Sequence, residues 1–207
     1  MNEIRTHIVC IVDRSGSMQP IAADAIGGFN SFLERQRLLP GEAVVSLVLF
    51  DHEYRRVYSA TPLAEAPRLD AHSYVPRGTT ALLDAIGRTI DDVVQVEQLP
   101  ETPKEHVIVV ILTDGLENAS ADYTYEVISR RIDTMQRQHG WEFVYLGANQ
   151  DAIAVAGKLN ISADASAAFA ANKQGVAHAY RIMHDRVAYS RDVCRSGNNT
   201  EPPSAKE

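Results

Sequence analysis

Three oxygen-bearing side chains alternate directly after an apolar run near the start of the sequence. Asp13, Ser15 and Ser17 stand two positions apart, so in an extended segment their side chains project to the same side. Oxygen atoms grouped in this way can cap a helix or bind a hard cation. Both interpretations of Ser15 and Ser17 are open at this point.

Further oxygen-bearing residues stand at two other element boundaries. Thr79 and Thr80 precede an amphipathic stretch, and Asp114 follows the most continuous apolar run of the chain. Two carboxylates and three hydroxyls suit a hard divalent cation such as Mg²⁺ or Mn²⁺, and no Cys or His cluster offers a softer site. Taken singly, such a threonine is a helix cap and an Asp-Gly pair is a turn. Only the combination indicates a metal site.

The composition is that of a globular protein with an acidic surface. The chain has 207 residues, of which 45% are hydrophobic and 23% charged, and its formal net charge is -7. This length predicts one domain, and the negative charge argues against a nucleic acid partner. No apolar run reaches the length of a membrane span, and the first ten residues lack an apolar signal segment. We therefore expect a cytoplasmic protein that does not contact a membrane, in agreement with only two cysteines.

Strand-like and helix-like segments alternate along the chain. Expected strands cover residues 6–12, 43–50, 55–60, 106–115, 141–148 and 165–171, and expected helices cover 20–38, 79–94, 123–138, 149–160 and a C-terminal stretch around 176–187. Residues 61–70 fit either a helical turn or a loop. The pattern predicts an α/β sheet covered on both faces, with ligands at the carboxyl ends of the strands. Asp13 and Asp114 both fall at that edge.

Three motifs give the chain a specific resemblance to a known family. "DRSGSM", "GTTALLDAI" and "LTDG" resemble the metal-ion-dependent adhesion site (MIDAS) of the von Willebrand factor type A (VWA) domain, and the resemblance extends from about Ile4 to at least Gly147. It implies a VWA-type, Rossmann-like three-layer α/β/α fold, in which a central, mainly parallel sheet has one antiparallel edge strand. With this fold we expect a single domain over residues 1–195 and a disordered tail over 196–207.

The resemblance also implies roles for individual residues. Ser15, Ser17 and a threonine would bind the metal directly, whereas Asp13 and Asp114 would bind it directly or through water. The family pattern Thr-x-Leu-x-x-Ala-Ile/Leu favours Thr80 as the threonine, with Thr79 as the alternative. We expect Glu117 and Asn118 to be loop residues, with contact to a metal-bound water as the less favoured interpretation.

The function implied by the resemblance is binding rather than catalysis. A Mg²⁺ or Mn²⁺ ion would bridge the domain to an Asp or Glu carboxylate of a partner protein, inside a larger intracellular assembly. The alternative is a Mg²⁺-dependent phosphohydrolase of the haloacid dehalogenase type. That class needs a second Asp two residues after the first, and Ser15 occupies this position here. A phosphate-binding glycine loop is also absent, so we expect no enzyme activity.

Two glycines and two arginines carry further expectations. Gly27 and Gly28, inside the first helix, would let that helix approach the sheet closely.

Arg14 and Arg77 stand beside the proposed metal ligands. If both side chains reached the rim of the site, they would surround the metal with positive charge and favour an acidic partner.

Overall fold

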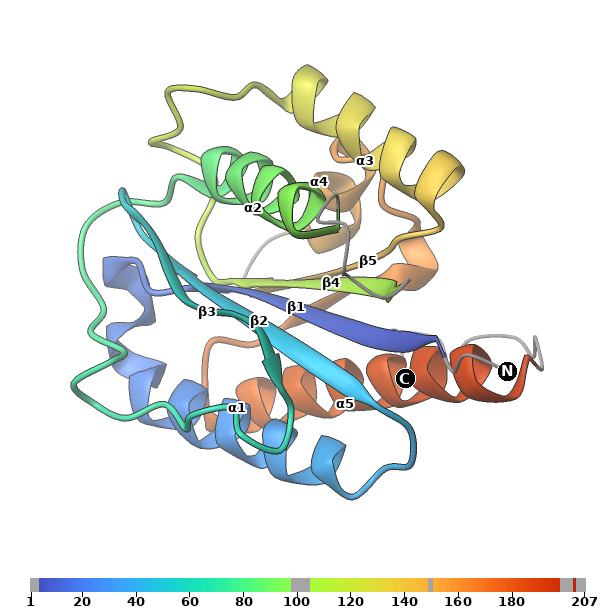
Figure 1. The fold of residues 1–207 in the computed structure, drawn as a ribbon. Helices are drawn as coiled ribbons and strands as arrows, with labels where there is room; N and C mark the ends of the chain where they lie inside the picture. Colours follow the sequence, from blue (N-terminus) through green and yellow to red (C-terminus); the bar gives the residue numbers. More distant parts are fainter. Residues whose placement is uncertain (1–3, 98–104, 149–150, 198–202, 204–207) are drawn as a thin grey trace.

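The computed structural model describes residues 4–97, 105–148, 151–197 and 203. In chain order the elements are β1 (Arg5–Asp13), η1 (Gly16–Ile21), α1 (Ala22–Arg37), β2 (Ala43–Phe50), β3 (Tyr54–Pro62), α2 (Leu82–Glu97), β4 (Glu105–Thr113), α3 (Tyr125–His139), β5 (Glu142–Ala148), α4 (Ala152–Lys158), η2 (Ala163–Ala165), β6 (Ser166–Phe169) and α5 (Lys173–Ser196). Strands and helices alternate as the sequence predicts, and Figure 1 shows the sheet between two helical layers.

The six strands form one mixed sheet in the order β3-β2-β1-β4-β5-β6. All neighbouring strands are parallel except β2 and β3, which are antiparallel and place β3 at one edge. The central strands β1, β2 and β4 are nearly continuous apolar runs because helices cover both of their faces. The predicted fold class, with its one antiparallel edge strand, is confirmed.

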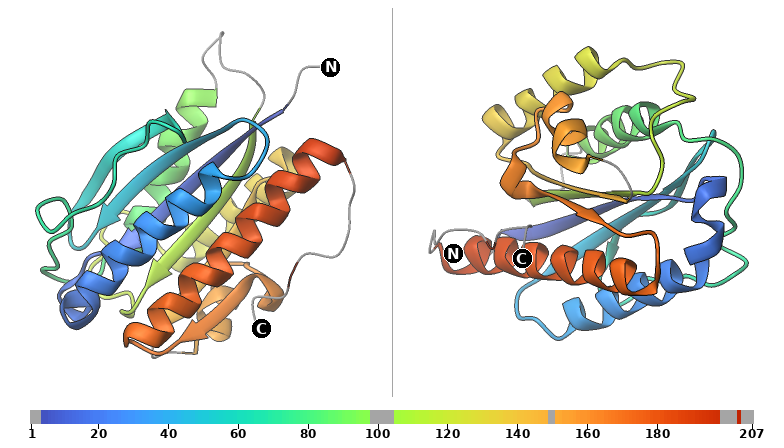
Figure 2. Two further views of the ribbon diagram at one scale, coloured as in Figure 1. Left: turned by 90° about the horizontal axis from the view of Figure 1, so that it is seen from below. Right: turned by 180° about the vertical axis from the view of Figure 1, so that it is seen from behind.

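Each face of the sheet has its own hydrophobic core. On one face, β1 contributes Ile8, Cys10 and Val12 to a core shared with α1 and α5. On the other face, Val9 and Ile11 join a core shared with α2, α3 and α4. Figures 1 and 2 show the same division, with α1 and α5 side by side beneath the sheet.

The glycine pair of α1 serves the contact between helices rather than a contact with the sheet. A Cβ atom on Gly28 would lie 2.2 Å from the ring of Tyr180 on α5, whereas a Cβ on Gly27 would meet no atom within 4 Å. The expectation that both glycines bring α1 close to the sheet is therefore wrong. Gly28 instead makes room for an aromatic ring between α1 and α5.

Several element boundaries differ from the sequence-based ones. The first helix is preceded by the 3-10 turn η1, and residues 63–81 form a long connection without a helix. At the C-terminus, α5 includes Ser196 and ends at Gly197, which has a left-handed φ of 68°. Apart from these residues and Pro203, the expected disordered tail lies outside the described residues. Among the helices that the structure describes, none has the length and apolar composition needed to cross a membrane.

Candidate metal centre

The two acidic residues of the candidate site lie at the ends of neighbouring strands. Asp13 is the last residue of β1, and Asp114 directly follows β4. The strands are parallel, with Val12 opposite Leu112. Asp13 and Asp114 therefore reach the same edge of the sheet, where α/β proteins place their ligands.

The Asp13 carboxylate is fully buried and is bound only by neutral groups. Its Oδ1 accepts a hydrogen bond from the Ser15 backbone N at 2.6 Å, and its Oδ2 accepts one from the Thr113 hydroxyl at 2.5 Å. Burial raises the pKa of Asp13 to about 6, because an ionised carboxylate loses its hydration there. No described Lys, Arg or His side chain forms an ion pair with it. A buried carboxylate without a counter-charge is the position that a cation would stabilise.

The two serines lie between Asp13 and Asp114. The Oγ atoms of Ser15 and Ser17 are 3.0 Å apart, and the Ser17 hydroxyl donates to Asp114 Oδ1 at 2.6 Å. Ser15 is the first residue before η1, yet its side chain makes no capping hydrogen bond. The structure therefore does not support a capping role for Ser15. Burial also raises the pKa of Asp114, so both carboxylates bind protons more readily than usual.

The structure distinguishes the two candidate threonines. Thr80 is buried, whereas Thr79 is exposed. A Cβ atom on Gly115 would lie only 2.6 Å from Thr80 Oγ1, so the Thr80 hydroxyl faces the backbone directly after Asp114. Of the two threonines, Thr80 is thus the one whose hydroxyl lies next to the loop that carries Asp114.

The donor set determines which cation could fit. Five side chains with oxygen donors converge on this edge: Asp13, Ser15, Ser17, Thr80 and Asp114. In the described part of the chain, no group of three or more His, Cys, Asp or Glu residues is placed to hold a metal ion. A site here would thus depend on hydroxyls as well as carboxylates, which suits a hard ion such as Mg²⁺ or Mn²⁺.

Asp51, which directly follows β2, fixes the loops around the site. It is fully buried, and its Oδ2 lies 3.0 Å from Arg14 Nε and 3.0 Å from Arg77 Nε. Its backbone O accepts a hydrogen bond from Ala81 N at 2.8 Å. Asp51 therefore connects the loop that carries Ser15 to the loop that carries Thr80. Asp51 follows a buried strand, just as Asp13 and Asp114 stand at the ends of buried strands. This shared position is the sequence signal that could have identified Asp51 as a residue of the site.

The same ion pairs change the expectation for Arg14 and Arg77. The Arg14 side chain is only 5% exposed, and Arg77 binds Glu53 as well as Asp51. Two carboxylates therefore balance the two guanidinium groups. The expected ring of free positive charge around the site is wrong.

Glu117 and Asn118 hold the loop after β4 against the start of α2. The Asn118 side chain accepts a hydrogen bond from Thr80 N at 2.9 Å, and its own backbone N donates to Thr80 O at 3.0 Å. Glu117 Oε2 accepts from Leu83 N at 2.9 Å. These bonds set the position of Thr80 relative to Asp114. They support the loop interpretation, since both side chains are used in fixing the backbone.

Tyr74 adds a further support that sequence reasoning missed. Its hydroxyl donates to the Asp13 backbone O at 2.6 Å, although 61 residues separate the two. The ring is buried in the core on the α1 side. Nothing in the local sequence signals this bond, because it depends on how residues 63–81 cross the end of β1.

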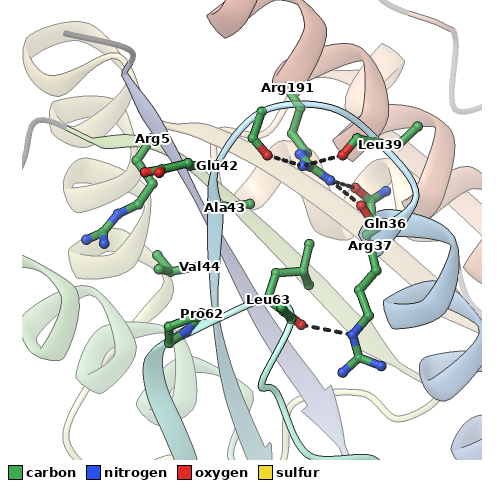
Figure 3. A pocket seen from close by; sticks show the side chains of 12 residues that line it. Arg5, Gln36, Arg37, Leu39, Glu42, Ala43, Val44, Pro62, Leu63 and Arg191 are labelled. Carbon is green, nitrogen blue, oxygen red and sulfur yellow. Dashed lines mark hydrogen bonds between the residues drawn. The ribbon is translucent and has the colours of Figure 1, made fainter.

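Two hollows of the described structure lie at the opposite edge of the sheet and include no candidate ligand. One hollow of about 380 Å³ lies between α1, β2 and α5 (Figure 3). There Arg191 donates to the backbone O of Gln36 at 2.6 Å and of Gly41 at 2.9 Å, and Arg37 donates to Leu63 O at 2.9 Å. These arginines satisfy carbonyl groups near the end of α1 and in the segment after β3. Their geometry indicates a structural role.

Comparison with known proteins supports the fold. No protein-family model and no curated protein sequence matches the chain. Three solved structures illustrate the likeness. Proximal thread matrix protein 1 from the mussel byssus has a TM-score of 0.63 and 13% identity, covering 88% of this chain and 48% of that one. The von Willebrand factor type A protein from Catenulispora acidiphila has a TM-score of 0.59 and 18% identity, covering 89% and 43%. Manganese-loaded TRAP from Plasmodium vivax has a TM-score of 0.58 and 14% identity, covering 84% and 71%.

The chain therefore has the fold of a von Willebrand factor type A domain. It spans less than half the length of the first two structures. A second structure of the mussel protein contains zinc in its MIDAS motif. At these identities the likeness establishes the fold alone. The candidate metal centre of this chain therefore has to be argued from its own side chains.

Proposed function

We propose that the chain is a metal-dependent protein-binding module. The observation that carries this proposal is the convergence of five oxygen-bearing side chains on one sheet edge, around a buried Asp13 that has no counter-charge. The hydroxyls of Ser15, Ser17 and Thr80 would bind Mg²⁺ or Mn²⁺ directly. Asp13 and Asp114 would bind it directly or through water.

The charge balance of the site favours a carboxylate from a partner. Asp13 and Asp114 together neutralise a divalent cation formally, and the hydroxyls add no charge. When bound, the ion offers a hard, electron-poor position to one further oxygen ligand. An Asp or Glu side chain of a partner protein is the matching donor. The module would thus bind its partner through one metal-bridged carboxylate.

The same residues give little support to a hydrolase. Ser15 stands where a haloacid dehalogenase-type enzyme needs its second Asp. Within the described residues, neither Ser15 nor Ser17 forms a hydrogen bond with a histidine that could activate it. We therefore propose that the chain has no turnover of its own, and that generic phosphatase and esterase substrates stay at background rates with Mg²⁺ or Mn²⁺.

For its setting we propose a larger intracellular assembly. Cys10 and Cys194 are both free thiols, which is compatible with a reducing compartment. An assembly would provide the partner carboxylate that a small binding module needs.

A pair of adjacent threonines gives the sharpest test of the metal site. Titration calorimetry with Mg²⁺ and with Mn²⁺ should show a loss of affinity of at least about tenfold for Thr80→Ala. Thr79→Ala should bind as the unaltered protein does, because Thr79 is exposed. Equal affinity in both variants, with both folded, would contradict the proposed ligand set.

A further inference from the structure

Large apolar side chains are exposed at few places in the described part of the chain. Five such residues are exposed: Ile4 (51%), Leu38 (85%), Val75 (48%), Leu116 (61%) and Ile153 (46%). Val75 and Leu116 belong to the two loops beside the candidate metal centre, whereas Ile4 and Leu38 lie at the opposite sheet edge. A single exposed apolar residue needs no explanation. Val75 and Leu116 differ from the other three in that both stand on loops beside the candidate metal centre.

Val75 is exposed on a loop that is anchored on both sides. The preceding Tyr74 donates through its hydroxyl to Asp13 O at 2.6 Å. Arg77, two residues after Val75, donates through its backbone N to Arg14 O at 2.9 Å. The backbone of Val75 is therefore held beside the end of β1 while its side chain remains exposed.

Leu116 is exposed on the other loop, after β4. The preceding Gly115 packs against the Thr80 hydroxyl, and the following Glu117 accepts a hydrogen bond from Leu83 N. Leu116 is thus held two residues from Asp114. Val75 and Leu116 approach the site from different loops, one anchored to β1 and one following β4.

Two of the charges near this surface, Arg14 and Arg77, are already paired. Arg14 and Arg77 bind Asp51, and Arg77 also binds Glu53. A partner would find an electron-poor metal position flanked by apolar side chains, with the two guanidinium groups already balanced by carboxylates. Apolar neighbours of the partner's carboxylate could bury the exposed parts of Val75 and Leu116.

Building on the proposed metal bridge, we propose that the partner segment carries its metal-binding carboxylate between bulky apolar side chains. The carboxylate binds at the metal, and its apolar neighbours pack on Val75 and Leu116. The occupant is therefore a mixed acidic and apolar segment of a partner protein.

A peptide library tests this chemistry directly. Heptapeptides with a fixed central glutamate and random flanking positions are incubated with the protein in Mg²⁺, in parallel with a library whose central residue is glutamine. We expect Mg²⁺-dependent enrichment of the glutamate library, with bulky apolar residues beside the glutamate. The double variant Val75→Ser, Leu116→Ser should reduce this apolar preference roughly tenfold and leave the affinity for Mg²⁺ alone unchanged. The matched control Ile4→Ser, Leu38→Ser should keep the preference.

The ways in which the proposal could fail are distinguishable. Mg²⁺-dependent enrichment of glutamate peptides with random or acidic neighbours would overturn the apolar recognition and leave the metal bridge intact. The apolar recognition is equally overturned if the control variant loses the preference as strongly as the double variant does. If Mg²⁺ binds but glutamate gains nothing over glutamine, the metal bridge itself is overturned, together with the apolar recognition.

Discussion

Replacing Asp13 by asparagine should stabilise the protein when no metal is bound. The substitution removes one negative charge from a fully buried position and keeps the shape of the side chain. An asparagine oxygen can still accept the hydrogen bond from Ser15 N, and its amide can donate to Thr113 Oγ1. The main change is therefore electrostatic.

The size of the effect follows from the pKa of Asp13. Burial raises this pKa from 3.8 to about 6. The folded protein then binds a proton more tightly than the unfolded chain does, so ionisation of Asp13 lowers the free energy of unfolding as the pH rises from about 4 to about 6. One pKa unit corresponds to about 1.4 kcal/mol, which gives an upper limit of about 3 kcal/mol. Above this window, in chelator, Asp13→Asn should be more stable than the unaltered protein by about 1 to 3 kcal/mol. Near pH ~4 the difference should disappear.

Urea unfolding followed by circular dichroism measures this quantity. In chelator, the unfolding midpoint of Asp13→Asn should lie above that of the unaltered protein at neutral pH. With Mg²⁺ at about a hundred times its dissociation constant, the unaltered protein should gain about 2.7 kcal/mol and Asp13→Asn much less. Asp185→Asn, an exposed carboxyl on α5, is the control and should change stability by less than about 0.5 kcal/mol.

Two results would refute this reasoning. One is an Asp13→Asn variant that folds but is less stable than the unaltered protein in chelator at neutral pH. The other is an equal gain of stability from Mg²⁺ in both proteins, which would show that the ion binds elsewhere.

Two further predictions concern residues that position the site without binding the metal. Asn118→Ala should weaken Mg²⁺ binding about tenfold, measured by calorimetry, because Thr80 N loses the side-chain oxygen that holds it. Asn118→Asp retains an acceptor for Thr80 N and should recover most of the affinity. Asp51→Asn should lower both the free energy of unfolding, by about 2 to 4 kcal/mol, and the Mg²⁺ affinity, since Arg14 would lose its buried counter-charge. The control for Asp51→Asn is Glu53→Gln, which removes an exposed partner of Arg77. Unchanged Mg²⁺ binding by Asp51→Asn would contradict the role of Asp51 in positioning the site.

The order of elements could be predicted because the strongest signals are local. The apolar runs of β1, β2 and β4 are long enough to identify buried strands, and the helices between them show a clear period. Gly28 was misjudged because its partner, Tyr180, is 152 residues away on α5. A sequence pattern shows that a glycine permits close approach. It does not show which element approaches.

The candidate site likewise combines residues that the sequence could predict with residues that it could not. Asp13, Ser15, Ser17, Thr80 and Asp114 were chosen from residue type, position at element boundaries and family resemblance, and their role as ligands stays a prediction. The groups that hold them in place were missed. Tyr74 and Asp51 act through bonds between loops that are far apart in the sequence, and such bonds follow from the fold rather than from any local motif.

A comparison of Asp13 with Asp51 gives a physical argument for the proposed cation at this edge. Both carboxyl groups are fully buried at the carboxyl ends of adjacent parallel strands. Asp51 lies against two guanidinium groups, from Arg14 and Arg77. Among the described residues, the partners of Asp13 are neutral: the backbone N–H and side chain of Ser15 and the Thr113 hydroxyl. Burial of an ionised carboxylate is costly unless a positive charge accompanies it. The chain supplies that charge to Asp51 from its own residues, whereas the described partners of Asp13 are neutral. A bound cation would supply the positive charge that Asp13 lacks, which is the physical basis of the proposed metal site.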